Sequence, residues 1–307
     1  MVYIWLIAGF VLLVKGADFF VDGSASVARL LRVPSVVIGL TIVAMGTSAP
    51  EAAVSITAGL TGNNDIAFSN VIGSNAFNLL VVVGVCACIK AFPVDREVLK
   101  RDFPVCIVAT VVLLLFALDG GLSRLDGVIL LLLMAAYLAY TVRSALRGRR
   151  PAEENREKIS PVKSILFIIG GLAAVIIGGD LVVDSASSIA ESFGLSQTLI
   201  GLTIIAVGTS LPELVTSIVA ARKGESGLAI GNVVGSNLFN ILFILGMSSV
   251  VRPITVSAQS LVNTALALLF TAGMFALCRI RGVMRRPAGA VCLLAYLGFT
   301  VYSICFA

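Results

Sequence analysis

Long apolar stretches separated by short polar breaks run along the whole chain. Stretches such as 105–118, 128–140 and 261–277 are so continuously apolar that only lipid or other membrane helices can cover them. Turn-forming residues mark the breaks, as in Arg32-Val-Pro34 and Asp119-Gly-Gly121. The pattern predicts ten membrane-spanning helices, at about 2–28, 34–60, 66–89, 103–119, 125–145, 163–190, 196–221, 227–250, 258–277 and 287–306.

Composition indicates an all-α integral membrane protein. Of the 307 residues, 58% are hydrophobic and only 13% are charged, which is more apolar surface than a soluble domain of this size can bury. The longest hydrophilic stretch, 147–163, has about 17 residues and is too short to fold as a domain of its own.

A duplicated segment divides the chain. Residues 39–84 and 201–246 align at a constant offset of 162, with 24 of 46 positions identical. We therefore expect a first five-helix repeat at 1–145, a cytoplasmic linker at 146–162 and a second five-helix repeat at 163–307. Because five is odd, the second copy enters the membrane from the opposite side. Two inverted repeats of this kind are typical of alternating-access transporters.

Basic residues lie almost entirely on one side of the predicted bundle. With ten spans, nineteen Lys and Arg residues fall on one side, and only Arg124 and Arg252 fall in loops of the other. This bias predicts a multi-pass protein of the cell (inner) membrane, with both termini outside in the periplasm and the linker in the cytoplasm. The net charge of +5 then reflects loops that contact the lipid bilayer. Nucleic acid is not an expected partner, and the sequence indicates no obligatory protein partner.

Six cysteines and the lack of histidine limit the chemistry. The cysteines lie in or beside apolar stretches and are interpreted as small packing side chains. A chain without histidine has no Ser-His-Asp triad, no His-ligated metal site and no imidazole proton relay. We therefore expect neither an enzyme nor a bound cofactor.

Each copy of the duplicated segment carries one glutamate beside a proline. Glu51 lies four residues after Thr47 and three after Ser48, so the three side chains can reach one face of a helix. Pro50 has no amide hydrogen, so we expect a helix break that frees backbone oxygens around residues 44–47. The second copy repeats the arrangement with Thr209, Ser210, Pro212 and Glu213. A lone carboxylate is costly in apolar surroundings, which makes the duplicated acid a candidate functional group.

The third and eighth predicted helices add hydroxyls and amides. These are Ser74, Asn75 and Asn78 in the first copy, and Ser236, Asn237 and Asn240 in the second. Gly231 and Gly235 form a small-residue pattern that lets helices approach closely, and we expect Ser69 and Gly73 to do the same in the first copy. Close approach brings the oxygens towards the glutamates.

Two further acids are duplicated. Asp18 and Asp22 recur as Asp180 and Asp184, and we interpret them as helix-end or gating residues. Lys15 has no counterpart, and we expect it to reach the membrane surface or to pair with Asp18 or Asp22.

The carboxylates, hydroxyls, amides and carbonyls form an all-oxygen set that suits hard cations. Ca²⁺ takes about 6–8 oxygen ligands, and two glutamates match its charge while also tolerating Na⁺. Two close carboxylates take up a proton when no cation is present. This competition favours Na⁺/Ca²⁺ antiport. The alternative is H⁺/Ca²⁺ antiport on the same scaffold, and a cation channel is the candidate from a different class.

The duplicated motifs are similar to those of a known family. Gly-Thr-Ser-x-Pro-Glu, followed by Gly-Ser-Asn-x-x-Asn, resembles the α-repeats of the cation/calcium exchanger superfamily, with the prokaryotic sodium/calcium exchangers as the nearest type. The resemblance implies that Na⁺ entering down its gradient drives Ca²⁺ out, commonly three for one. It also implies that the first and sixth helices slide across the core.

The same resemblance implies a set of ligands. Glu51 and Glu213 would be shared by Ca²⁺ and Na⁺, with help from the carbonyls of Thr47 and Thr209. An external Na⁺ site would use the Ala206 carbonyl, Thr209, Ser210, Glu213 and Ser236. The inverted internal site would use the Ala44 carbonyl, Thr47, Ser48, Glu51 and Ser74, and Asn78 and Asn240 would line the middle. Some relatives have an aspartate in place of Asn240, so potassium dependence is not expected here.

Overall fold

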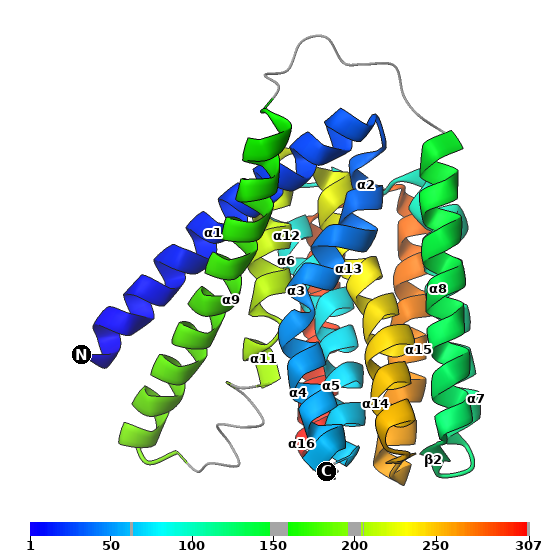
Figure 1. The fold of residues 1–307 in the computed structure, drawn as a ribbon. Coiled ribbons are helices and arrows are strands. Elements are labelled where there is room, and N and C mark those ends of the chain that lie inside the picture. The colour runs from blue at the N-terminus through cyan, green and yellow to red at the C-terminus, as the bar shows by residue number, and fades with distance from the viewer. Residues whose placement is uncertain (62–63, 148–158, 196–203, 205, 306–307) are drawn as a thin grey trace.

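The computed structural model is a bundle of long helices (Figure 1), and it describes residues 1–61, 64–147, 159–195, 204 and 206–305. The α-helices of the first half are α1 (Val2–Leu31), α2 (Ser35–Ile38), α3 (Ala44–Thr47), α4 (Ala49–Thr61), α5 (Asn64–Phe77), α6 (Val83–Ile89), α7 (Phe103–Ala117) and α8 (Arg124–Arg147). Those of the second half are α9 (Pro161–Ser192), α11 (Ala206–Gly208), α12 (Leu211–Lys223), α13 (Ser226–Phe239), α14 (Gly246–Val251), α15 (Ala258–Arg281) and α16 (Arg286–Cys305).

Short π-helical segments interrupt several of these helices. They are η1 (Gly39–Val43), η2 (Asn78–Val82), η3 (Val98–Asp102) and η5 (Asn240–Leu245). A π-helical turn widens the backbone and leaves the α-helical hydrogen-bond pattern, and such turns are frequent at functional sites. Two of them, η2 and η5, begin at Asn78 and Asn240, which occupy equivalent positions in the two copies of the duplicated segment.

The predicted helix ranges agree with the described helices to within a few residues, apart from 196–203 and 205, which lie outside the described residues. Six helices of the described part are long and apolar enough to cross a membrane. The count rises to seven if the bent pair Ser35–Thr47 and Ala49–Thr61 is one span. The chain is therefore a mostly helical membrane protein, as predicted.

The most buried spans are those that carry the asparagine motifs. Within the most apolar window of each span, 94% of the Ser226–Val251 residues and 72% of the Ile66–Ile89 residues are buried. The corresponding share is 28% for both Arg124–Arg147 and Pro161–Ser192. Helices α13 and α5 with their continuations thus form the centre of the bundle, and α8 and α9 lie at its periphery.

Helices α1 and α9 form a tightly packed pair that leans away from the other helices (Figure 1). Glycines allow this contact: a Cβ added at Gly171 would lie 2.5 Å from the backbone nitrogen of Phe20. One added at Gly178 would lie 2.6 Å from the backbone nitrogen of Leu13. The two backbones therefore touch directly, because any side chain at these positions would push them apart.

Two short antiparallel ribbons, which the sequence did not predict, join the two halves of the chain. Strand β1 (Phe92–Pro93) pairs with β4 (Val283–Met284), and β2 (Gly121–Leu122) pairs with β3 (Ile254–Thr255). At the offset of 162, β3 is the counterpart of β1, and β4 is the counterpart of β2. Each ribbon therefore takes one strand from each half.

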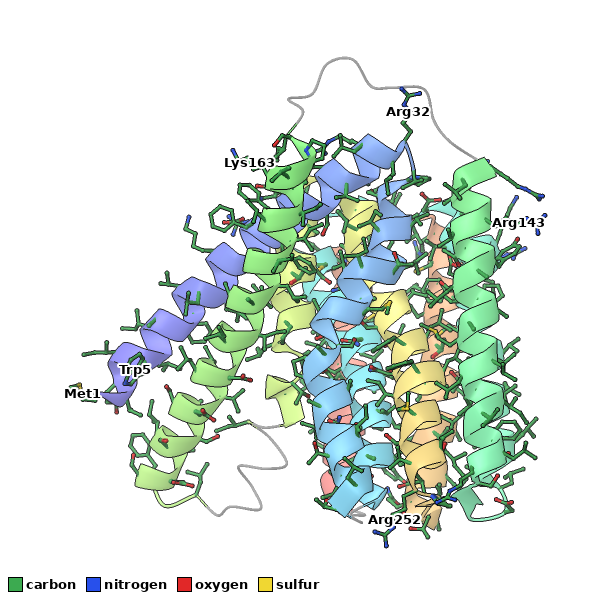
Figure 2. All side chains as sticks on the ribbon, in the orientation of Figure 1. Met1, Trp5, Arg32, Arg143, Lys163 and Arg252 are labelled. Carbon is green, nitrogen blue, oxygen red and sulfur yellow. The ribbon has the colours of Figure 1, made fainter. Side chains whose placement is uncertain are left out.

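Basic side chains are distributed unequally between the two ends of the bundle. Arg32, Arg143 and Lys163 lie at one end, and Arg252 lies at the other (Figure 2). Large apolar side chains such as Trp5, which is 55% exposed, cover the periphery between these ends. An apolar belt between two polar ends is the surface of a protein that sits in a bilayer.

Candidate cation-binding site

The second predicted helix breaks where the sequence predicts. Helix α3 ends at Thr47 and α4 begins at Ala49, and the two segments are bent by 49°. Between them Ser48 leaves the helical conformation, with φ −83° and ψ 11°. Pro50 falls in the first turn of α4, where a missing amide hydrogen costs no helical hydrogen bond. In the second copy Ser210 takes nearly the same conformation, with φ −92° and ψ 5°.

One detail of the predicted break is wrong. The carbonyl of Ala44 is not freed, because it accepts a hydrogen bond from the backbone nitrogen of Ser48 at 3.0 Å. That bond closes the last turn of α3, so the helix continues to the break without losing this partner. Two hydroxyls also approach the same carbonyl oxygen, Thr47 Oγ1 at 3.4 Å and Ser236 Oγ at 3.5 Å.

Both glutamates lie at the start of a helix and are fully buried. Glu51 is in the first turn of α4, and Glu213 is in the first turn of α12. Neither side chain is exposed. The N-terminal end of a helix carries a partial positive charge, which favours a carboxylate at this position. The helix breaks therefore place two acids where the local backbone offsets part of the cost of burying them.

Serines from one half of the chain hold the glutamates of the other half. Ser48 Oγ donates a hydrogen bond to Glu213 Oε1 at 2.8 Å, and Ser210 Oγ donates one to Glu51 Oε1 at 2.9 Å. The two contacts are images of each other at the offset of 162. In each glutamate the second oxygen, Oε2, has no hydrogen-bond partner among the described residues.

Four asparagines form a second reciprocal network. Asn75 Nδ2 donates to the carbonyl of Asn237 at 3.3 Å, and Asn237 Nδ2 donates to the carbonyl of Asn75 at 3.1 Å. Asn78 Nδ2 donates to Asn237 Oδ1 at 3.2 Å, and Asn240 Nδ2 donates to Asn75 Oδ1 at 3.0 Å. The amino groups of all four side chains are used in this way. The Oδ1 atoms of Asn78 and Asn240 have no hydrogen-bond partner within the described part of the chain.

Six buried oxygens of the predicted site thus lack a hydrogen bond in the part of the chain that the structure describes. They are Glu51 Oε2, Glu213 Oε2, Asn78 Oδ1, Asn240 Oδ1, Ser74 Oγ and Thr209 Oγ1. A buried polar atom without a partner costs about 1–3 kcal/mol. Oxygens left open in this way are ligands that Na⁺ and Ca²⁺ prefer. The described residues contain no cluster of three or more His, Cys, Asp or Glu that could hold a metal ion, so the two carboxylates act with neutral oxygens.

The other predicted site residues lie around these oxygens. Thr47 and Ser236 are fully buried, and Ser236 Oγ lies 3.5 Å from both Glu213 Oε1 and the Ala44 carbonyl. Thr209 is half-buried beside the second break. Ala206 begins α11, and its side chain lies outside the described part.

Sequence reasoning missed a layer of residues behind the glutamates. Asn232 Nδ2 donates to Ser217 Oγ at 3.0 Å, and Asn70 Nδ2 donates to Ser55 Oγ at 3.0 Å. The two contacts are again images at the offset of 162. All four residues are identical in the aligned copies, and that identity was the signal that could have identified them.

The small-residue pattern of the second copy makes the predicted contact. A Cβ added at Gly235 would lie 2.7 Å from Leu40 Cα, so α13 meets η1 backbone to backbone. In the first copy Ser69 is exposed, so it does not make the close contact expected of it. Gly73 has no described atom within 4 Å of an added Cβ, and the counterpart of η1, 201–205, lies outside the described residues apart from Ile204.

The acids of α1 pair with a different base from the one predicted. Lys223 Nζ lies 2.8 Å from Asp22 Oδ1 and 3.4 Å from Asp18 Oδ1. Lys15 makes no ion pair with a described residue. Lys223 is the last residue of α12, so these ion pairs connect α1 to the C-terminal end of α12.

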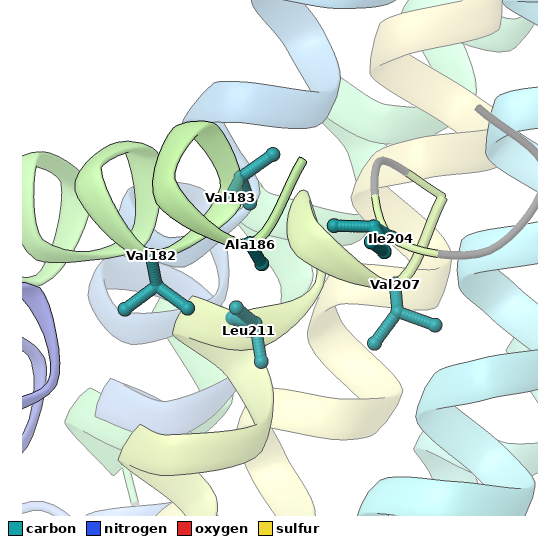
Figure 3. Close-up of a pocket in the computed structure, with 6 residues that line it drawn as sticks. All are labelled: Val182, Val183, Ala186, Ile204, Val207 and Leu211. Atoms are coloured by element: carbon teal, nitrogen blue, oxygen red, sulfur yellow. The ribbon is translucent and has the colours of Figure 1, made fainter. Parts of the chain in front are cut away.

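A cavity of about 350 Å³ lies beside the second break, between α9 and the α11–α12 region (Figure 3). Its lining is apolar and consists of Val182, Val183, Ala186, Ile204, Val207 and Leu211. The described side chains that line it offer no oxygen to a cation, so we do not include it in the candidate site.

Comparisons with known proteins agree with this geometry. The family model described as sodium/calcium exchanger protein matches residues 1–143 and 163–305. The chain is 37% identical to the inner membrane protein YrbG of Escherichia coli over 81% of this chain and 79% of that protein. It is 33% identical to the sodium/calcium exchanger MaX1 of Methanosarcina acetivorans over 97% of each chain.

A solved structure has the same fold along almost the whole length. The sodium-calcium exchanger NCX_Mj, soaked with 2.5 mM Na⁺ and 0.1 mM Ca²⁺, superposes with a TM-score of 0.86 at 32% identity, covering 99% of this chain and 98% of that chain. Together with the family match over both halves, this structural similarity confirms the family that the duplicated motifs indicated. The chain belongs to the sodium/calcium exchanger protein family.

Proposed function

We propose that this protein is a secondary active antiporter that exchanges Na⁺ for Ca²⁺ across the membrane by alternating access. The observation that carries the proposal is the set of unpartnered buried oxygens around Glu51 and Glu213 at the centre of the bundle. The two carboxylates supply a charge of −2 in a dry interior. Such a pair requires neutralisation by a cation, and competition of Ca²⁺ with Na⁺ for the same oxygens couples the two fluxes.

Each ion site of this proposal is built on one broken helix. The external Na⁺ site consists of the Ala206 carbonyl, Thr209, Ser210, Glu213 and Ser236. The internal one consists of the Ala44 carbonyl, Thr47, Ser48, Glu51 and Ser74. The carbonyls of Thr47 and Thr209 join the two glutamates around Ca²⁺, and Asn78 and Asn240 line the middle. The open Oδ1 atoms of both asparagines support this last assignment.

Ten spans in two inverted repeats, 1–145 and 163–307, are part of the proposal. Its support is the set of contacts that recur at the offset of 162, namely the two Ser–Glu hydrogen bonds and the two β-ribbons. The unequal distribution of basic side chains supports both termini outside and the 146–162 linker in the cytoplasm. In this orientation the close contact between η1 and α13 lies on the cytoplasmic side of the proposed site.

Exchange of three Na⁺ for one Ca²⁺ moves one net charge. Such a step is driven by about 2.3 kcal/mol per 100 mV of membrane potential. H⁺/Ca²⁺ antiport is not favoured, because the family match is to sodium/calcium exchangers. A channel is not favoured because it has no need of two sequestered acids held by reciprocal serines.

The deciding experiment measures ⁴⁵Ca²⁺ uptake into proteoliposomes loaded with Na⁺. The Na⁺ gradient and the pH gradient are imposed separately, and vesicles with Glu51→Gln serve as the matched control. We expect uptake that follows the Na⁺ gradient and is absent in the variant. Uptake that follows a pH gradient and ignores Na⁺ would contradict the proposal in favour of H⁺ coupling. Uptake without any counter-ion would contradict it in favour of a channel.

A further inference from the structure

Asn232 contacts residues from both halves of the candidate site. Its side chain is fully buried within α13. Thr47 Oγ1 lies 3.0 Å from Asn232 Oδ1. Asn232 Nδ2 lies 3.0 Å from Ser217 Oγ and 3.4 Å from the backbone carbonyl of Glu213. Asn232 therefore connects a predicted cation ligand of the first copy to the acidic helix turn of the second.

These contacts fix the direction in which the Asn232 amide faces. The Glu213 carbonyl can only accept a hydrogen bond, so the Nδ2 amino group faces it and Oδ1 faces Thr47. An amide oxygen also only accepts, so the hydroxyl of Thr47 is the donor in the contact between Thr47 and Asn232. The hydroxyl hydrogen of Thr47 is thereby directed at Asn232, and the lone pairs of its oxygen point elsewhere.

The Thr47 hydroxyl has other acceptors within reach. The carbonyls of Val43 and Ala44 lie 3.1 Å and 3.4 Å from Thr47 Oγ1. The carboxyl group of Glu213 also neighbours this side chain. A hydroxyl has one hydrogen to donate, and a hydrogen bond to a carboxylate is roughly twice as strong as one between neutral groups. Asn232 therefore competes with Glu213 for the hydrogen of Thr47.

The direction of this hydrogen matters for one of the two transported ions. A hydroxyl binds a cation through its oxygen, so its hydrogen has to point away from the cation. Contacts behind a ligand that hold it in the binding orientation raise the affinity for the metal ion. In the proposed function the side chain of Thr47 belongs to the internal Na⁺ site, whereas Ca²⁺ contacts the Thr47 carbonyl. The orientation of the hydroxyl thus affects Na⁺ more than Ca²⁺.

We propose that Asn232 is a positioning residue that sets the Na⁺ affinity of the site by accepting the hydroxyl hydrogen of Thr47. It acts through Thr47 and contacts no ion itself. Without Asn232 the hydroxyl turns to the Glu213 carboxylate, and Na⁺ has to displace that hydrogen bond in order to bind. This inference rests on the proposed function, because it requires Na⁺ and Ca²⁺ to compete for one site.

The test measures ⁴⁵Ca²⁺ uptake into proteoliposomes loaded with unlabelled Ca²⁺, because an antiporter can exchange Ca²⁺ for Ca²⁺ without Na⁺. The Ca²⁺ dependence of uptake gives the Ca²⁺ affinity, and inhibition by Na⁺ added to both sides gives the Na⁺ affinity. Asn232→Ala and Asn232→Leu both remove the acceptor for Thr47. The leucine fills the space of the asparagine, so it preserves folding if the alanine leaves a destabilising cavity. Ser217→Ala is the matched control, since it removes the partner of Nδ2 and leaves the bond to Thr47 in place.

We expect Asn232→Ala and Asn232→Leu to raise about fivefold the Na⁺ concentration that halves this exchange, the size expected for loss of one buried hydrogen bond. The Ca²⁺ concentration for half-maximal uptake is expected to change less than about twofold, and the control is expected to shift neither value by more than that. In a Thr47→Val background, which lacks the hydroxyl, Asn232→Leu is expected to cause no further loss of Na⁺ affinity.

Equal changes of both affinities in the Asn232 variants would overturn this inference, because a merely structural role affects both ions alike. A further loss of Na⁺ affinity in the Thr47→Val background would also overturn it, because Asn232 would then act through another group. Wild-type exchange that Na⁺ does not inhibit is a different outcome. It would contradict the proposed function itself.

Discussion

Ser48 Oγ donates a hydrogen bond to Glu213 Oε1 at 2.8 Å, although the two residues are 165 positions apart in the chain. Its image joins Ser210 to Glu51 at 2.9 Å. Each broken helix therefore supplies one acid to the site and fixes the acid of the other helix. One oxygen of each carboxylate is hydrogen-bonded and the other has no partner among the described residues, so each carboxylate is held in one orientation.

Removing either serine hydroxyl is expected to weaken cation binding by a similar factor. Ser48→Ala and Ser210→Ala remove the shortest hydrogen bond to each carboxylate, and we expect about a tenfold rise in the Ca²⁺ concentration for half-maximal uptake. The measurement is ⁴⁵Ca²⁺ uptake into Na⁺-loaded proteoliposomes. Ser192→Ala is the control, since this exposed serine donates to the carbonyl of Ile189 in its own helix. A large effect of one serine and none of the other would contradict the reciprocal arrangement.

Neutralising either glutamate is expected to abolish exchange without unfolding the protein. In Glu51→Gln and Glu213→Gln a buried charge is replaced by an amide of the same shape, which lowers the cost of burial. We therefore expect an unfolding temperature in Ca²⁺-free detergent at least equal to that of the wild type. Ca²⁺ is expected to raise this temperature in the wild type only, because binding to the folded state stabilises it. A Ca²⁺-dependent rise in a non-exchanging variant would place the cation elsewhere.

Adding a carboxylate at the middle of the site is expected to introduce proton sensitivity. Asn240 Oδ1 is buried and has no partner among the described residues, so Asn240→Asp adds a third acid to the proposed site. This acid binds a proton at low pH and a cation after it has lost the proton. We expect Ca²⁺ affinity of the variant to rise with pH more steeply than in the wild type, as measured by uptake at several pH values. Asn78→Asp is the symmetric counterpart, and an unchanged profile in both would argue against a central position.

The close contact between α1 and α9 is open to a test with two neighbouring glycines. A Cβ at Gly171 would lie 2.5 Å from the Phe20 backbone, whereas one at Gly170 would have nothing within 4 Å. We expect Gly171→Leu to separate the two helices and to reduce exchange at least tenfold, while Gly170→Leu leaves it near wild type. Circular dichroism verifies that both variants stay helical. Similar exchange in the two variants would mean that the contact is not needed for transport.

The sequence was most informative where each copy of the motif carries its own local signal. Ser48 and Ser210 lie at helix breaks because a proline follows two residues later, and Glu51 and Glu213 are buried together with the apolar stretches that contain them. These features depend on neighbours within one helical turn, so the sequence pattern predicts them.

Contacts between distant segments of the chain could not be predicted from the sequence. Nothing in the local pattern indicates that Lys223 pairs with Asp22, 201 residues away, or that two-residue strands meet. The exposure of Ser69 could not be predicted for another reason. The aligned copies predict equal packing, whereas the matching Gly231 packs against the backbone of Val36 and Leu40.

The two β-ribbons have a consequence for how the protein is assembled. Because β1 pairs with β4 and β2 with β3, each ribbon takes one strand from each half of the chain. A half produced alone would leave the strand edges of both ribbons unpaired. The ribbons therefore make the two halves depend on each other for backbone hydrogen bonds outside the helices.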